Sequence, residues 1–307
     1  MNSASHQTNR RPPLGGGLRS SWVWILFAVP AVFLSAFLLL YPFLDSARIS
    51  LLDWTGTGQG TFVGLENYYD LVRDPIARLA LRNTLVYSIG MTMGTVGIGG
   101  AIALAIDRRI PGASTFKFLV FLPVLLPIVF TSLVWAFFLD GNFGGINDIL
   151  GWIHPSLSRP WLGDPATVNL VIILVSVLQF AGFPMVILVA ALRDIPRDIH
   201  EAATIDGVSP LQRVRHISIP SIRDVIATIT LIQFMFGFRV FDQVFVMTRG
   251  GPGRFSEVAA TFVWREAFVN RRFGYATAQA IVTSLVIAVL SMAYLTIIRP
   301  RRLERSG

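Results

Sequence analysis

The sequence has 307 residues, none of them cysteine, and its 26 basic residues include a single lysine, Lys117. The lack of cysteine excludes disulfides, iron–sulfur clusters and thiolate zinc sites. Lys117 follows a phenylalanine, so no GxxxxGK(S/T) phosphate loop exists and the chain cannot be its own P-loop ATPase. Four scattered histidines form no HExxH pattern, which argues against a metal site. Charged residues make up only 14%, against about 25% in soluble domains.

Long apolar blocks take the place of that charge, and 53% of the residues are hydrophobic. A membrane-spanning helix needs about 20 consecutive, mostly apolar residues. Six blocks meet this requirement: 22–44, 83–106, 116–139, 168–192, 225–247 and 276–298. The first is too long for the core of a cleaved signal and is interpreted as a retained span. We therefore expect an all-α, polytopic transmembrane helical bundle with six spans.

The basic residues indicate the orientation of these spans. They concentrate before the first span, in the second and fourth loops, and in the tail 299–307. The positive-inside rule places these segments, and hence both termini, in the cytoplasm. It also explains the net charge of +8 without a nucleic-acid partner. The loop 248–275 disagrees, because it carries five arginines although alternation places it outside. Residues 1–21 are predicted to form a flexible tail.

A polar island at residues 194–220, called the elbow below, separates the fourth and fifth spans. Gly207 can adopt the left-handed conformation that ends a helix. Ser209 and Gln212 have the spacing of a capping box that opens a second helix, and Pro220 is expected to stop it. The sequence thus predicts an amphipathic helix-turn-helix whose apolar face needs a partner.

The elbow resembles the signature of permease subunits of binding-protein-dependent ABC importers. Glu201, Ala202, Ala203, Gly207 and Pro220 stand at the spacing of that signature, and an isoleucine replaces its usual leucine before the proline. Residues 62–68, 238–242 and 247–252 are similar to the carbohydrate-uptake branch, of the maltose or glycerol-phosphate type of first permease.

This resemblance implies a bacterial inner-membrane transport subunit that is not an enzyme, with residues 22–298 as its transmembrane domain. The implied partners are a second homologous permease, a cytoplasmic ATPase dimer that binds ATP and Mg, and an extracytoplasmic solute-binding protein. The implied cargo is a sugar or related polyol, with glycerol phosphate or another small polar solute as the alternative. The resemblance also implies that the elbow couples this chain to the ATPase, through Glu201, Ala202, Ala203, Asp206 and Gly207.

Polar residues inside the spans are candidates for the substrate path. Gln179 and Gln233 fall near the bilayer midplane, where transporter sites usually lie, and Phe183 and Phe238 are near enough to stack on sugar rings. The alternative is that the glutamines only hold helices together, a contribution of about 0.6 kcal/mol each.

Arg239 and Asp242 are three residues apart in the fifth span, on one helical face, and can pair there. Ionisable residues within hydrocarbon are costly and tend to be functional. Asp242 is therefore a further candidate for the substrate path, whereas a pair that only fixes helix packing is the alternative.

The sequence argues against two other classes of protein. An ion-coupled secondary carrier would call for paired acids near the midplane, yet only Asp242 lies well inside a span. A lipid-modifying membrane enzyme would call for a cluster of His, Asp or Glu at the membrane face, and the sequence has none.

Overall fold

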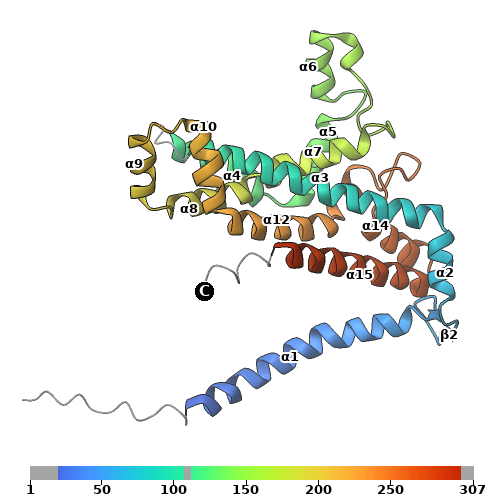
Figure 1. The fold of residues 1–307 in the computed structure, drawn as a ribbon. Coiled ribbons are helices and arrows are strands. Elements are labelled where there is room, and N and C mark those ends of the chain that lie inside the picture. The colour runs from blue at the N-terminus through green and yellow to red at the C-terminus, as the bar shows by residue number, and fades with distance from the viewer. Residues whose placement is uncertain (1–19, 107–111, 299–307) are drawn as a thin grey trace, which may run out of the picture. The chain divides into compact units, whose positions relative to one another are not determined.

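A computed structural model describes residues 20–106 and 112–298, which are almost entirely helical (Figure 1). The chain divides into two compact units, residues 1–48 and the part from residue 49 onward, and each is described by itself. The predicted basic tail 299–307, and all but the last two residues of the predicted tail 1–21, lie outside the described residues.

The first unit contains the helix α1 (Ser20–Ile49). Its 30 residues correspond to a length of about 45 Å, more than a span requires. Large apolar side chains from Val29 to Leu44 are exposed around the helix. A helix that is apolar on all sides is typical of a membrane span, and α1 contains the predicted first span.

The second unit has two continuous helices of spanning length, α3 (Pro75–Ile106) and α15 (Phe273–Ile298). Three pairs of shorter helices are also apolar enough, but each is bent at a short break. They are α4 (Ala113–Leu125) with α5 (Ile128–Phe138), bent by 98°; α7 (Val168–Phe180) with α8 (Gly182–Arg193), bent by 43°; and the helix Pro210–Ser221 with α12 (Arg223–Phe238), bent by 71°. With α1, the described residues hold three continuous candidate spans, or up to six if each bent pair is one span.

The expectation of one continuous fifth span over 225–247 is wrong. Helix α12 ends at Phe238, and α13 (Asp242–Met247) begins after a break. The last turn of α12 tightens, because the amides of Arg239 and Val240 donate to carbonyls three residues back, at 3.1 and 3.3 Å. Such bonds close the end of a helix.

Helix α3 lies at the centre of the second unit and packs against α7, α8 and α12. Its glycines allow close approach, as in other membrane helix pairs. A Cβ atom at Gly94 would lie 2.4 Å from the Val177 side chain, and one at Gly99 would lie 2.5 Å from the Ala181 carbonyl oxygen. Buried side chains of α3, α8 and α12 form one core cluster, and those of α3, α7 and α13 form another.

Smaller elements flank these helices. Strands β1 (Leu52–Asp53) and β2 (Thr61–Phe62) pair antiparallel, with Leu52 opposite Phe62. Asn67 of α2 (Glu66–Arg73) donates to the carbonyls of Ser50 and Leu52, at 2.9 and 3.0 Å. The others are α6 (Gly145–Ile153), the 3-10 turn Pro155–Leu157, α14 (Ala259–Trp264) and the π-helical turn Arg265–Val269.

Most of the arginines of the loop 248–275 form ion pairs within the loop. The side chain of Glu257 is fully buried, and its carboxylate lies 3.4 Å from Arg254 and 3.2 Å from Arg265. Glu266, whose side chain is 6% exposed, lies 3.8 Å from Arg254 and 3.6 Å from Arg272. Three of the five arginines are thus structural partners of two glutamates, and their number says little about the side of the membrane.

Candidate functional site

The elbow contains α9 (Arg197–Ile205) and α10 (Pro210–Arg213), joined by a tight turn. Gly207 has a φ of +70°, which confirms the predicted left-handed residue. The amide of Val208 donates to the Ala203 carbonyl at 3.0 Å, and that of Gly207 donates to the Thr204 carbonyl at 3.2 Å. This pair of hydrogen bonds is the Schellman motif, which satisfies the last carbonyls of α9.

The predicted capping box is confirmed at the start of α10. The Ser209 amide donates to Gln212 Oε1 at 3.0 Å, and the Gln212 amide donates to Ser209 Oγ at 3.4 Å. Arg213 then donates to Thr204 Oγ1 at 2.9 Å, which links the two helices. Local hydrogen bonds therefore fix the elbow as one rigid unit.

The second helix ends at Ser221, one residue after the predicted stop at Pro220. The helix passes through a π-helical turn at Val214–Ser218 and continues as α11 (Ile219–Ser221), with the 71° bend coming after it. A π turn shifts the hydrogen bonds from i→i+4 to i→i+5. Because Pro220 has no N–H to contribute, this shift accommodates it within the helix.

Four of the five residues predicted to couple to the ATPase lie on the outside of the elbow. Glu201, Ala202, Asp206 and Gly207 are exposed, whereas Ala203 is only 4% exposed. Ala203 therefore packs within this chain and supports the exposed face from behind.

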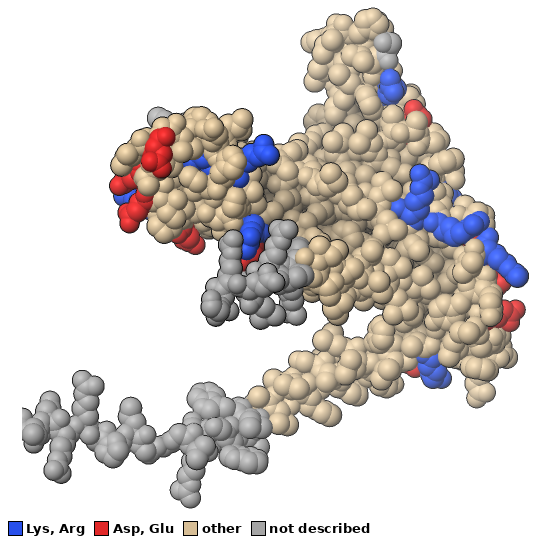
Figure 2. Space-filling model, viewed as in Figure 1, with Lys and Arg blue, Asp and Glu red and all other residues tan. Residues whose placement is uncertain are grey.

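Two large apolar side chains extend this exposed face, and sequence reasoning did not select them. Ile205 is 86% exposed and Leu211 is 77% exposed. Figure 1 shows α9 and α10 at one end of the second unit, away from α14 and α15, and Figure 2 shows acidic side chains gathered over α9. The end of the elbow thus combines apolar tips with negative charge. The sequence signal was the amphipathic pattern itself, in which Ile205 and Leu211 flank the turn.

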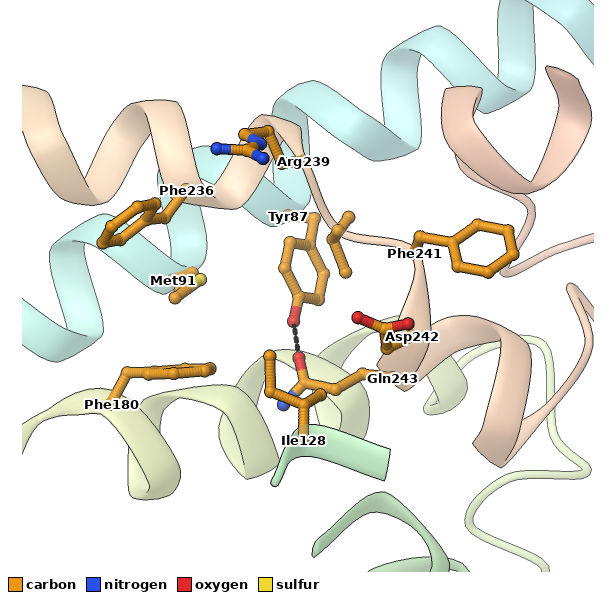
Figure 3. Close-up of a pocket in the computed structure, with 10 residues that line it drawn as sticks. Tyr87, Met91, Ile128, Phe180, Phe236, Arg239, Phe241, Asp242 and Gln243 are labelled. Atoms are coloured by element: carbon orange, nitrogen blue, oxygen red, sulfur yellow. Dashed lines mark hydrogen bonds between the residues drawn. The ribbon is translucent and has the colours of Figure 1, made fainter. Parts of the chain in front are cut away.

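A second feature is a cavity of ≈ 340 Å³ at the break between α12 and α13 (Figure 3). Helices α3, α5, α7, α12 and α13 all contribute to its wall. The lining residues are Tyr87, Met91, Ile128, Phe180, Phe236, Arg239, Val240, Phe241, Asp242 and Gln243. In Figure 3 the rings of Phe180 and Phe236 lie at one end of the cavity and the Asp242 carboxylate at the other.

A buried polar network stands behind this wall. The Tyr87 hydroxyl donates to the Gln243 side-chain carbonyl, and Ser176 hydrogen-bonds to both. Gln243 Nε2 donates to Gln179 Oε1 at 3.2 Å, which also accepts from Thr131 Oγ1 at 2.9 Å. The network connects α3, α5, α7 and α13. Gln179, placed in the substrate path by the sequence, is therefore an interhelical contact that orients a lining residue.

The other predicted path residues lie outside the lining. Gln233 is fully buried and donates to Thr95 of α3 at 2.8 Å. Phe238 is 5% exposed, and Phe183 is half-buried with its ring centroid 6.3 Å from that of the lining residue Phe236. The contact between Gln233 and Thr95 joins two helices, which is the kind of role that the sequence left open as the alternative.

Asp242 does line the cavity, but its predicted pairing with Arg239 is wrong. Within the described residues no ion pair joins them. The prediction assumed a continuous helix with both residues on one face, whereas Arg239 caps α12 and Asp242 begins α13. Both charged side chains are exposed, and both border the cavity.

Tyr87 and Gln243 are lining residues that the sequence analysis missed. Gln243 directly follows Asp242 in the chain, and Tyr87 is a hydroxyl-bearing residue within an apolar block. A polar side chain within an apolar block is the signal that identified Gln179, and the same signal applies to Tyr87 and Gln243.

A helical bundle with apolar helices of spanning length, a largely apolar cavity with a few polar groups at a broken helix and an exposed helical elbow defines a multi-pass membrane transport protein. Residues 75–304 match the family described as binding-protein-dependent transport system inner membrane component, and the chain belongs to this family. It is a permease subunit of an ABC importer.

Relatives match over most of their length. The chain is 32% identical to a probable ABC transporter permease protein, YurN, of Bacillus subtilis, over 87% of this chain and 92% of the relative. It is 30% identical to the lactose transport system permease protein LacF of Rhizobium radiobacter, over 90% and 94%. The fold is similar to that of a chain in the crystal structure of a bacterial alginate ABC transporter in complex with an alginate pentasaccharide-bound periplasmic protein. The TM-score is 0.81 at 21% identity, and the match covers 92% of this chain and 96% of that one.

Proposed function

We propose that this permease carries a sugar or a related polyol through a path that includes the cavity at the α12–α13 break. The cavity carries the proposal, because it combines amide, hydroxyl and carboxylate groups with the rings of Phe180 and Phe236. Sugar hydroxyls require such hydrogen-bonding groups, and apolar walls with a few placed polar groups are typical of ligand sites. The names of relatives support a sugar, since one is a lactose permease and one structure is an alginate transporter.

The broken helix strengthens this proposal. Irregular backbone at membrane depth is tolerated where it is buried in protein or lines a water-filled cavity, and discontinuous helices typically form transporter binding sites. In this arrangement Asp242 contacts solute directly. Gln179, Gln233, Phe183 and Phe238 form the layer behind it that holds the helices in place.

The elbow is the proposed joint to the ATPase. Its contact face is formed by the exposed coupling residues expected from the sequence, Glu201, Ala202, Asp206 and Gly207, together with the apolar tips Ile205 and Leu211. The fifth expected coupling residue, Ala203, supports this face from behind. A cytoplasmic ATPase dimer would bind ATP and Mg, so this chain catalyses no reaction. Because the elbow is rigid, closure of the ATPase dimer would move it as a body and shift the path between its two openings.

The remaining partners and the topology follow from the same proposal. A second permease completes the path, and an extracytoplasmic solute-binding protein delivers the solute. The elbow and both termini lie in the cytoplasm.

The test is uptake of labelled solutes into cells that express the full importer, together with co-purification of the ATPase. Asp242→Asn should reduce sugar uptake at least about tenfold while the ATPase still co-purifies, because a lost charge-assisted hydrogen bond costs about 1.5–3 kcal/mol. Asp148→Asn, on the exposed face of α6, is the matched control and should leave uptake unchanged. Uptake of glycerol phosphate but of no sugar by the unmodified importer would contradict the proposed cargo.

The same assay tests the elbow. Ile205→Ser with Leu211→Ser should abolish both uptake and ATPase co-purification, because the exposed apolar tips are lost. The control is Ile149→Ser with Ile153→Ser on α6, where the side chains are 61% and 71% exposed; it should retain the ATPase. Equal ATPase recovery from both double variants would overturn the proposed joint.

A further inference from the structure

A second cavity, of ≈ 800 Å³, lies between the elbow and the adjacent ends of α3, α4 and α8. It is separate from the cavity at the α12–α13 break, with which it shares no lining residue. Its volume is within the range of small-molecule sites, about 300–1,000 Å³.

The polar part of its wall is basic. Lys117, Arg193, Arg197, His200 and Arg213 line it, and no aspartate or glutamate is among the described lining residues. Within the described part of the chain, no carboxylate lies within 4.0 Å of the lysine or of these three arginines. The contrast with the loop 248–275 is direct, because there three arginines have glutamate partners.

The side chain of Arg213 is only partly hydrogen-bonded. Its Nη2 donates to Thr204 Oγ1, but its buried Nε has no hydrogen-bond partner among the described residues. A buried donor without a partner costs roughly 1–3 kcal/mol, and a shift of this side chain toward an anion in the cavity would relieve that cost.

The rest of the wall is apolar and includes Leu104, Ile106, Leu192 and Ile195. Ile106, Leu192 and Ile195 also belong to the buried core cluster of α3, α8 and α12. Basic groups beside an apolar wall suit an amphipathic anion better than a fully hydrated one. Basic pockets between membrane helices are known to bind lipid headgroups.

We propose that this cavity binds a phosphate-bearing anion, supplied as the headgroup of an anionic phospholipid. The phosphate contacts Arg193, Arg197 and Arg213, and the acyl chains leave along the apolar wall. The bound lipid ties the elbow to the ends of α4 and α8, so occupancy stiffens the elbow. This inference goes beyond the proposed function, because binding by this chain needs neither solute nor ATPase.

The experiment uses the full-length chain in nanodiscs of phosphatidylcholine with or without phosphatidylglycerol, and native mass spectrometry of retained lipid. Wild type should retain phosphatidylglycerol in preference to phosphatidylcholine. Arg193→Gln with Arg197→Gln and Arg213→Gln should weaken this retention by roughly 100-fold, about fivefold for each basic residue. The matched control removes the same charge from exposed arginines at the opposite end of α3, with Arg73→Gln, Arg78→Gln and Arg82→Gln, and should retain the lipid.

A second arm separates the two sources of phosphate. Detergent-solubilised chain is heated in inorganic phosphate and in chloride at equal ionic strength. If phosphate raises the Tm of wild type but not of the triple variant while phosphatidylglycerol is not preferred, the site stands and its ligand is free phosphate. Arg213→Gln alone, with a wild-type Tm in chloride, replaces the triple variant if that one fails to fold. Equal lipid retention and equal phosphate response in the cavity variant and wild type would overturn the proposal.

Discussion

The elbow and the loop 248–275 look alike in the sequence, since each is a polar stretch with several arginines beside apolar spans. In the structure, the arginines of the two regions differ in whether they form ion pairs. In the loop, Arg254, Arg265 and Arg272 have buried glutamates as partners. In the elbow, Arg197 and Arg213 have no ion pair within the described residues and border an open cavity instead.

Apolar residues show the same contrast. Val258, Ala259 and Phe262 in the loop are at most 2% exposed, whereas Ile205 and Leu211 in the elbow are largely exposed. Groups that form ion pairs or pack within the chain stabilise its fold, and groups left exposed are available to partners. We therefore expect substitutions in the loop to act on stability, and substitutions in the elbow to act on coupling.

The largest effect on stability is expected for Glu257→Ala. Removing one partner of a buried ion pair leaves uncompensated charge and costs about 3–5 kcal/mol. We expect about 3 kcal/mol here, because Arg254 and Arg265 remain 31% and 30% exposed and can reach water. Chemical denaturation of the detergent-solubilised chain measures the change.

The matched control for this carboxylate is Glu201→Ala in the elbow. Glu201 is exposed and forms no ion pair within the described residues, so its loss should change stability by less than about 0.5 kcal/mol while reducing uptake. If Glu257→Ala and Glu201→Ala lowered the free energy of unfolding by similar amounts, the proposed distinction between a stabilising loop and a coupling elbow would be contradicted.

The next largest effect is expected for Asn83→Ala, which detaches the loop from α3. The Asn83 amide donates to the carbonyls of Phe255 and Glu257, at 2.7 and 2.9 Å, and is buried. Asn83→Ala removes the donor of the buried bond to the Glu257 carbonyl; leaving a buried carbonyl unsatisfied costs about 1–3 kcal/mol, and we expect about 2. Asn169→Ala is the control, because Asn169 also donates to Phe255 but at an exposed position; its effect should be well under half as large in the same denaturation assay.

Local features were predictable from the sequence because local physics determines them. Gly207, Ser209 and Gln212 each act within a few residues, and the apolar blocks mark helices by composition alone. Features that depend on distant contacts were not predictable. Gln233 meets Thr95, which is 138 residues away.

The break between α12 and α13 shows this limit most clearly. Phe238 to Asp242 is part of an apolar block without proline or glycine at the break itself, so the pattern predicts a continuous helix. The pairing expected for Arg239 and Asp242 failed for the same reason. The cavity follows from tertiary packing around this break, which periodicity does not encode.

A smaller loss of stability than for Glu257→Ala, and the sharpest test of the elbow, is expected for Gly207→Ala. An added Cβ would meet nothing within 4 Å, so the only cost is the φ of +70°, which for a residue with a side chain is about 1–2 kcal/mol. Because α9 ends at this turn, the cost should appear as faster amide hydrogen exchange in α9 and α10, with α3 and the loop 248–275 unchanged. Gly207→Asn should cost less, since asparagine tolerates the left-handed conformation better than alanine. Uptake should fall in the order glycine, asparagine, alanine, whereas faster exchange in the elbow of Gly207→Ala with full uptake would show that coupling does not depend on its rigidity.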